Sequence, residues 1–209
     1  MNIQNQELLR ALKFACGKFR ETDELTEEDL SDIYELNLSD VSVTGKNYDI
    51  DLKELPELPN LRKLSLRNFV IADDEVKFIN ENRKLMDLSF DRCTFDARTI
   101  PLYIESLKAL SMRYCDNLGG LRFLAPERLK LLGMDKVDIA AIRGLERVKS
   151  LSLQSSRVYR LGAIRKCEDL RELRLDGTEY SPIDQEYIDV LGRDNKIKIS
   201  KEEYYHPTM

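Results

Sequence analysis

Few side chains in this sequence are suited to covalent or acid–base chemistry. The single histidine, His206, lies in the terminal segment YYHPTM, where a chain end is poorly placed to hold a preorganised triad or metal site. The four cysteines (Cys16, Cys93, Cys115 and Cys167) form no C-x-x-C pair, which favours free buried thiols over a disulfide framework. The motifs H-E-x-x-H, G-x-S-x-G, G-x-G-x-x-G and the P-loop are absent. We predict no catalytic residue, no metal site and no cofactor.

A second set of side chains is suited to recognition. Arg67, Asp91, Arg113 and Asp135 alternate in charge and follow one another at intervals of 24, 22 and 22 residues. One interpretation is that these charges pair with one another, as surface ion pairs worth about 0–1 kcal/mol each. The other is a polar face for a partner of complementary charge. We favour pairing as the reason for the alternation and still expect any binding site on the same face.

The predicted anchor of a binding face is an aromatic side chain. Binding hot spots favour Trp, Tyr and Arg, and this chain contains no Trp. Tyr114, with Arg113, Arg92 and Leu131 nearby, is therefore the expected anchor cluster, unless its ring lies flat on its own loop. The predicted protein-binding residues are Arg67, Asp91, Arg92, Arg113, Tyr114 and Asp135.

The elements that must position these residues come from an internal repeat. Seven segments share the pattern L-x-x-L-x-L, where L is an apolar residue, and they begin 28, 24, 22, 22, 19 and 22 residues apart. They cover residues 33–43, 61–71, 85–95, 107–117, 129–139, 148–158 and 170–180, and a degenerate eighth copy, NKIKIS, covers 195–200. Repetition at this period indicates a solenoid of stacked coils.

Before several of the copies, apolar residues recur at every third position. In VYRLGAIRKCEDLRELRL (158–175), this step runs from Val158 to Leu173 and ends in a step of two at Leu175. A step of three suits 3₁₀ structure, in which positions i and i+3 eclipse, and a step of two suits a strand. Each coil should therefore contain one short strand and one short 3₁₀ or α segment.

The sequence resembles the leucine-rich repeat family from about residue 26 to residue 200, through the recurring L-x-x-L-x-L. LTEEDLSDIYELNLSD (25–40) is similar to the N-terminal cap of bacterial, internalin-like members. The resemblance implies an α/β solenoid. It would be a leucine-rich repeat horseshoe with a parallel concave β-sheet, short 3₁₀ or α segments on the convex side and an N-terminal helical cap.

Three regions of one solenoid domain are expected. Residues 1–32 form the N-terminal cap, with an amphipathic helix over 5–19 that extends to Phe19 and a second helix capped by Thr26. Residues 33–180 form the repeats. Residues 181–209 form a C-terminal cap, with a helix that begins at Ser181–Pro182 and stops at Gly192. An edge strand and tail follow, with Lys196, Lys198 and Lys201 protecting the sheet edge against further pairing.

Within each copy, written L1-x2-x3-L4-x5-L6-x7-x8, positions 3, 5 and 7 should project from the concave face, because strand side chains alternate. Position 3 is Glu35, Lys63, Asp87, Ala109, Leu131, Ser150 and Glu172. Position 5 is Asn37, Ser65, Ser89, Ser111, Gly133, Ser152 and Arg174. Position 7 is Ser39, Arg67, Asp91, Arg113, Asp135, Gln154 and Asp176. Cys93 and Cys115 fall at position 9, where packing is favoured over a disulfide between adjacent coils.

Composition narrows the function. The formal charge of −5 and the pI of about 5.2 argue against nucleic-acid binding and against docking on anionic membrane. No apolar run approaches a bilayer span, and MNIQNQELLRALKF lacks the features of a secretion signal, which predicts a cytoplasmic protein unless export uses an unrecognised route. We predict a monomeric, non-catalytic bacterial protein that binds a protein partner through the concave face. The alternatives are an exported effector or surface protein that recognises a host protein, and a structural protein that self-assembles through its ends.

Overall fold

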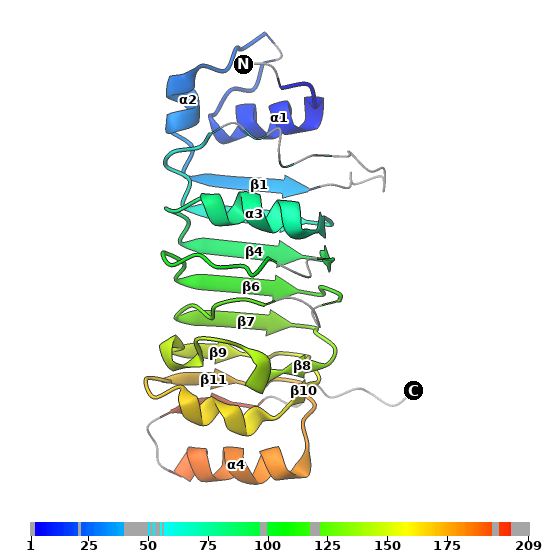
Figure 1. Cartoon of the computed structure of the whole chain (residues 1–209), viewed down its shortest axis with the longest axis vertical. Helices are drawn as coiled ribbons and strands as arrows, with labels where there is room; N and C mark the ends of the chain where they lie inside the picture. The colour runs from blue at the N-terminus through cyan, green and yellow to red at the C-terminus, as the bar shows by residue number, and fades with distance from the viewer. Residues whose placement is uncertain are drawn as a thin grey trace.

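The computed structural model describes residues 3–20, 22–39, 50, 52, 55, 57–96, 100–117, 122–193 and 197–201. Within these ranges the chain forms one long parallel sheet of eight strands, in the order β1-β2-β4-β6-β7-β9-β11-β12 (Figure 1). The strands are β1 Glu35–Ser39, β2 Lys63–Arg67, β4 Asp87–Asp91, β6 Ala109–Arg113, β7 Arg128–Leu132, β9 Ser150–Ser152, β11 Glu172–Arg174 and β12 Lys198–Ser200. Each copy of the repeat thus adds one strand, which confirms the predicted solenoid.

The core is a stack of inward side chains from successive strands. In β2, Leu64 and Leu66 are buried, and their register partners on β4, Leu88 and Phe90, are fully buried. The side chains between them point to the opposite face and are partly exposed. A single coil cannot cover these apolar residues, so stacking of neighbouring coils supplies the burial that holds the fold together.

The outer side of each coil carries short elements, and the step of three is explained there. These elements are α3 Asp73–Glu81, η3 Ile139–Ala141, η4 Leu145–Arg147, η5 Leu161–Lys166, and the two-stranded pairs β3 Val70–Ile71 with β5 Thr94–Phe95 and β8 Val137–Asp138 with β10 Val158–Tyr159. Leu161 and Ile164 of η5 are buried one 3₁₀ turn apart, as the sequence predicts. Figure 1 shows α3 and the yellow turns of η5 in front of the sheet, so these outer segments cover one of its two faces.

The predicted register is wrong at one copy. Strand β7 pairs with β6 so that Leu129 is opposite Leu110 and Leu131 is opposite Met112. This copy therefore starts at the buried Pro126, three residues before the predicted start at Leu129. The motif alone cannot separate the two registers, because Leu129, Leu132 and Met134 have the same spacing as the observed inward residues, Pro126, Leu129 and Leu131. The last three intervals become 19, 22 and 22 residues.

Each strand of the large sheet from β2 to β11 is followed within three residues by a residue with left-handed backbone. The positions and their φ angles are Asn68 (61°), Arg92 (53°), Tyr114 (50°), Gly133 (62°), Ser155 (49°) and Gly177 (63°). The backbone N–H of Tyr114 donates to the carbonyl oxygen of Leu132 at 2.9 Å, and Arg92 donates in the same way to Arg113 at 2.8 Å. These turns tie the exit of each strand to the next coil, and position 8 of the repeat is a conformational requirement of the fold.

The N-terminal cap consists of α1 Gln6–Ala15 and α2 Glu27–Ser31. Leu8 and Leu12 of α1 are fully buried against the first coil, but the helix ends at Ala15, and Phe19 is 75% exposed. The prediction that the amphipathic helix extends to Phe19 is therefore wrong, because the chain turns at Gly17 (φ 71°).

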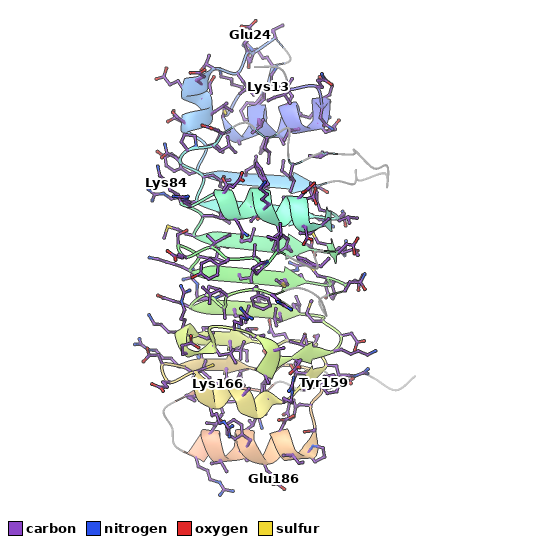
Figure 2. The ribbon with its side chains drawn as sticks, viewed as in Figure 1. Lys13, Glu24, Lys84, Tyr159, Lys166 and Glu186 are labelled. Atoms are coloured by element: carbon purple, nitrogen blue, oxygen red, sulfur yellow. The ribbon has the colours of Figure 1, made fainter. Side chains whose placement is uncertain are left out.

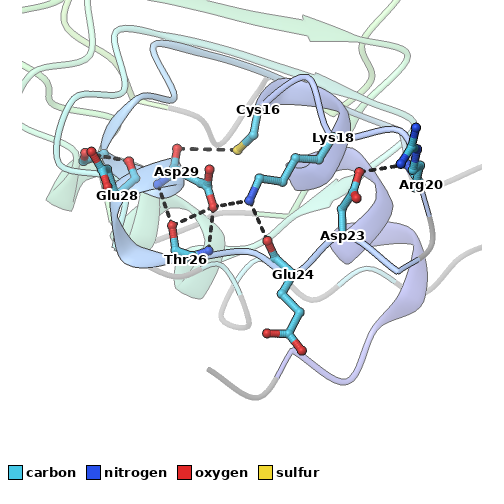
Figure 3. A network of polar contacts seen from close by, with 9 residues as sticks. Cys16, Lys18, Arg20, Asp23, Glu24, Thr26, Glu28 and Asp29 are labelled. Atoms are coloured by element: carbon cyan, nitrogen blue, oxygen red, sulfur yellow. Dashed lines mark hydrogen bonds and ion pairs between the residues drawn. The ribbon is translucent and has the colours of Figure 1, made fainter.

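A polar network joins α1 to α2 (Figure 3). Thr26 accepts from the backbone N–H of Asp29 at 3.2 Å, and Asp29 accepts from that of Thr26 at 2.7 Å, which confirms the predicted helix start as a capping box. Lys18 donates to the Asp29 carboxylate at 2.6 Å and to the Glu24 carbonyl at 2.6 Å. The hydrogen bond from Lys18 is the main reason that the pKa of Asp29 is lowered from 3.8 to about 2.

At the C-terminal end, α4 Pro182–Arg193 packs on η5 and covers the last coil (Figure 1). Ser181 accepts from the backbone N–H of Asp184 at 3.2 Å, which confirms the predicted start of this helix. Gly192 does not stop the helix as expected, because it is a helical residue with Arg193 after it. Strand β12 lies at the sheet edge, as predicted. Lys196 and His206 lie outside the described residues.

Position 9 of the repeat is turned inward. Cys93 and Cys115 are buried free thiols that donate to carbonyl oxygens of the preceding coil, on Leu66 at 3.4 Å and on Phe90 at 3.6 Å. The hydroxyl group of Ser156, on a later coil, makes the equivalent contact with the Leu131 carbonyl oxygen at 3.3 Å. Packing and hydrogen bonding thus account for both cysteines.

No helix among the described residues is long and apolar enough to cross a membrane.

Candidate protein-binding surface

One face of the large sheet lies opposite α3 and the 3₁₀ segments, and we call it the open sheet face. Its residues are those at positions 3, 5 and 7 of each copy. With the observed register they are Glu35, Lys63, Asp87, Ala109, Arg128, Ser150, Glu172 and Lys198 at position 3; Asn37, Ser65, Ser89, Ser111, Lys130, Ser152, Arg174 and Ser200 at position 5; and Ser39, Arg67, Asp91, Arg113, Leu132, Gln154 and Asp176 at position 7. Small polar residues occupy position 5 on most of the strands, and Lys130 and Arg174 interrupt them.

The charges of the first four strands largely pair with one another. Lys63 Nζ lies 2.9 Å from Glu35 Oε1, and this contact lowers the pKa of Glu35 and raises that of Lys63. Arg67 Nε lies 3.5 Å from Asp91 Oδ2, and Arg113 Nε lies 3.8 Å from Asp91 Oδ1. The alternating charges are therefore ion-paired over these three residues. The arginines are about half exposed, so each pair adds about 0–1 kcal/mol to stability.

Asp135 does not belong to this series. The position 7 residue of β7 is Leu132, which lies opposite Arg113. Asp135 lies beyond the αL turn, where its carboxylate is 3.4 Å from Arg157, and Arg157 also pairs with Glu179 at 2.8 Å. The prediction that Asp135 continues the alternation is wrong, because the motif in this copy is shifted by three residues.

Tyr114 and Arg92 lie at the margin of the open sheet face, in the αL turns that follow β6 and β4. Tyr114 is 48% exposed, and one side of its ring covers Gly133, where an added Cβ would lie 2.3 Å from the ring. The ring thus rests on the neighbouring turn and not only on its own loop. Leu131, the expected apolar neighbour, is buried in the core and does not contribute to the surface.

The last four strands carry a group of cations, of which the sequence predicts Arg174 on this face but not the two on β7. Arg128 and Lys130 of β7 are exposed on the open sheet face, and Arg174 of β11 is also exposed. Lys130 is opposite Ser111 on one side and Ser152 on the other, and Ser152 is opposite Arg174. In the observed register, Pro126 takes the place of the first leucine of the motif. The sequence favours the wrong register because Leu129, Leu132 and Met134 match the motif better than a set that begins with proline. Accepting a proline at position 1 would have placed Arg128 and Lys130 on this face.

The described residues hold few groups for covalent or metal chemistry. None of them form a cluster of three or more histidine, cysteine, aspartate or glutamate side chains that could hold a metal ion. Burial raises the pKa of Cys16 and raises that of Cys167 to about 11, and the contact with Cys115, together with burial, raises that of Cys93. These three thiols are disfavoured as nucleophiles at neutral pH. The open sheet face presents charged groups and hydroxyl groups, which are suited to noncovalent binding.

No protein-family model matches the chain, and no curated protein matches it. Among solved structures, the fold is similar to that of internalin C2 from Listeria monocytogenes, with a TM-score of 0.50 and 18% sequence identity over 95% of this chain and 94% of that one. It also aligns with internalin F from the same organism, with a TM-score of 0.49 and 15% identity over 95% and 76% of the two chains. At these identities the likeness concerns the fold.

Proposed function

We propose that this chain, which has the internalin-like leucine-rich repeat fold, is a non-catalytic module that binds a protein partner on the open sheet face. The observation that carries the proposal is the contrast between the two sides of the sheet. One side packs on the core beneath α3 and the 3₁₀ segments, and the other presents a continuous row of polar and charged side chains on eight described strands. Curved solenoid sheets of this kind supply extended binding surfaces.

Preorganisation favours this use of the face. The strands are paired to neighbours along their length, and the αL turns fix both the exit of each strand and the side chains beside it. A partner that docks there would pay little ordering entropy from this side, so contacts of modest strength would give useful affinity. Tyr114, Arg92 and the ion-paired Arg67, Asp91 and Arg113 remain the predicted contact residues in the first half of the face, and Asp135 remains one only at its margin.

Site-specific photo-crosslinking tests the proposal. Benzoylphenylalanine is introduced at Asn37, Ser89 or Arg128 on the open sheet face, and each variant is irradiated in lysate of the source organism. The matched controls carry the same group at Lys77 on α3 and at Lys166 on η5, both exposed on elements outside the open sheet face; Lys166 is labelled in Figure 2. We expect one partner to crosslink from the sheet positions and not from the controls. Crosslinks confined to Lys77 or Lys166 would contradict binding on this face.

The compartment that we propose is the cytoplasm. The four cysteines are free, and three of them are buried in the core. Thiols remain reduced in the cytoplasm, whereas an exported protein with neighbouring thiols on adjacent coils would tend to oxidise. Alkylation of protein taken from source cells, before and after unfolding, tests this. Four reactive thiols after unfolding, with Cys93, Cys115 and Cys167 protected in the folded protein, agree with the proposal, and a disulfide between Cys93 and Cys115 would contradict it.

A further inference from the structure

We infer that the second half of the open sheet face binds an acidic segment of the partner. A carboxylate or phosphoryl oxygen would sit over Ser152, between Lys130 and Arg174. The inference rests on the proposed function, because it names the chemistry that the open sheet face recognises. Four observations support it: an unsatisfied hydroxyl group, the unpaired cations of β7, the register that places Lys130 and Arg174 on either side of that hydroxyl group, and the satisfied state of the nearby carboxylates.

The hydroxyl group belongs to Ser152, at the centre of β9. Its residue is only 8% exposed, and its Oγ is buried without a hydrogen-bond partner among the described residues. Its neighbours in sequence, Leu151 and Leu153, point into the core, so the Ser152 side chain projects from the open sheet face. A buried hydroxyl group without a partner is unfavourable, and an acceptor supplied by a ligand would satisfy it.

Other hydroxyl groups in this half of the face already have partners. Ser150 Oγ donates to Glu172 at 3.0 Å, and Ser200 Oγ donates to Asp176 at 2.6 Å. In the first half, Ser89 and Ser111 are partly exposed and can bond to water. Ser152 therefore differs from the other serines described on this face, because its hydroxyl group is both buried and without a hydrogen-bond partner.

The cations are Lys130 and Arg128 of β7. Both are exposed, and neither forms an ion pair with any residue that the structure describes. By contrast, Lys63, Arg67 and Arg113 in the first half of the face each contact a carboxylate. Unpaired cations on an otherwise ion-paired surface favour a ligand that brings its own negative charge.

The register places these groups around one point. Lys130, Ser152 and Arg174 are successive partners across β7, β9 and β11, and adjacent strands lie about 4.8 Å apart. An anionic oxygen above Ser152 would accept its O–H and lie between an ammonium and a guanidinium group. Charge-assisted hydrogen bonds of this kind are stronger than neutral ones, and Arg174 adds directional donors.

The nearest carboxylates do not supply that oxygen. Asp176 is 5% exposed and accepts from Gln154 at 2.9 Å and from Ser200, while its Oδ2 lies 3.7 Å from Arg174 Nε. Glu172 accepts from Ser150. Both carboxylates are engaged with other groups, and the Ser152 hydroxyl still lacks an acceptor. The chain carries a net charge of −5, so attraction of an acidic segment would be local to this region of the face.

The test uses fluorescein-labelled oligoglutamate, an oligoglutamine of equal length and a phosphoserine-containing peptide, with binding followed by fluorescence anisotropy on the full chain. We expect the acidic peptides to bind and oligoglutamine not to bind. Ser152→Ala and Lys130→Gln should each weaken binding about tenfold. The matched controls, Ser89→Ala and Lys63→Gln, alter the same residue types on strands that do not border Lys130, and they should change affinity less than about twofold.

The variants also separate binding from folding. Ser152→Ala removes an unsatisfied hydroxyl group, so its melting temperature should equal or exceed that of the wild type. Tighter binding of the phosphoserine peptide would assign the site to phosphoryl groups, and equal or weaker binding would assign it to carboxylates. Failure of both acidic peptides to bind, or equal weakening by the controls, would overturn the inference. The proposed function would survive that result if the sheet-face crosslinks were still obtained.

Discussion

At the scale of single residues, the strand exits show how the repeat constrains residue choice. The αL conformation costs a non-glycine residue about 1–2 kcal/mol relative to the right-handed region, yet Arg92 and Tyr114 both adopt it. Gly133 occupies the same position one coil later and makes room for the Tyr114 ring. The glycine at one turn and the tyrosine at the previous turn therefore pack together, which holds the half-exposed Tyr114 ring at the margin of the open sheet face.

Replacement of this glycine should destabilise the protein. In Gly133→Ala, the new Cβ would lie 2.3 Å and 2.4 Å from Tyr114 ring atoms, and φ is 62°. We expect a loss of about 1–3 kcal/mol in the free energy of unfolding, measured by urea denaturation. The same change in a Tyr114→Ala background should cost less, because the ring no longer obstructs the methyl group.

Gly162→Ala is the matched control. Gly162 has no neighbour within 4 Å of an added Cβ and does not have a positive φ. Alanine there should stabilise the protein by up to about 1 kcal/mol, since it restricts the unfolded chain. Equal losses at both positions would show that the packing of Tyr114 on Gly133 does not govern this turn.

At the scale of elements, the N-terminal cap is held by a network of charges rather than by helix length. Helix α2 has only five residues, and an isolated helix of that length is not stable in water. Its start is fixed by Thr26 and Asp29, and Lys18 ties it to the segment that follows α1 (Figure 3). Asp29 thus serves the capping box and the contact between the two cap helices at once.

This network should make cap stability depend on pH. The folded-state pKa of Asp29 is about 2, below its ordinary value of 3.8. A lowered pKa means that the stabilisation is fully present above about pH 3.8 and is lost as the pH falls towards 2. We expect Asp29→Asn to destabilise the protein at neutral pH, and the difference from wild type to shrink over this range, measured by urea denaturation at a series of pH values.

A double-mutant cycle identifies the cause. Lys18 supplies the largest contribution to the lowered pKa of Asp29, through a 2.6 Å hydrogen bond. In a Lys18→Met background, the pH dependence that Asp29 contributes should therefore decrease. If it is unchanged, the Thr26 contacts would be the dominant cause instead.

At the scale of the whole molecule, the sheet has two edges, and the two ends of the solenoid are closed differently. Helix α1 packs against β1 through Leu8 and Leu12, both 0% exposed, whereas β12 is the edge strand at the other end, beside α4. An uncovered edge of a parallel sheet would offer unpaired backbone groups to another chain. We propose that α1 covers the β1 edge and keeps the protein monomeric as long as this helix stays docked.

Removal of the docking residues should cause self-association. In Leu8→Lys/Leu12→Lys, α1 would lose its buried face, and β1 would become accessible, so we expect oligomers by size-exclusion chromatography with light scattering. Phe14→Lys/Phe19→Lys adds the same charges at side chains that are 71% and 75% exposed and should remain monomeric. Oligomers of the wild type or of this control would contradict the role assigned to the cap.

The sequence by itself determined the inward side chains, the strand-and-3₁₀ alternation and the helix starts. Leu64 and Leu66 are buried because strand side chains alternate, and Thr26 and Ser181 begin helices because their hydroxyl groups satisfy free backbone N–H groups. These preferences act over a few residues, so a repeated pattern reveals them. The ion pairing of Arg67 with Asp91 also follows from the repeat, because it places both at position 7 of adjacent coils.

Only the tertiary structure decided the features that depend on the pairing and register of neighbouring strands. Leu129, Leu131 and Leu132 allow two phases of the motif, and pairing with β6 selects the one that buries Leu131 and exposes Lys130. The unsatisfied hydroxyl group of Ser152 arises from its neighbours on β7 and β11, and no local pattern could reveal it, since burial is a property of contacts between distant coils.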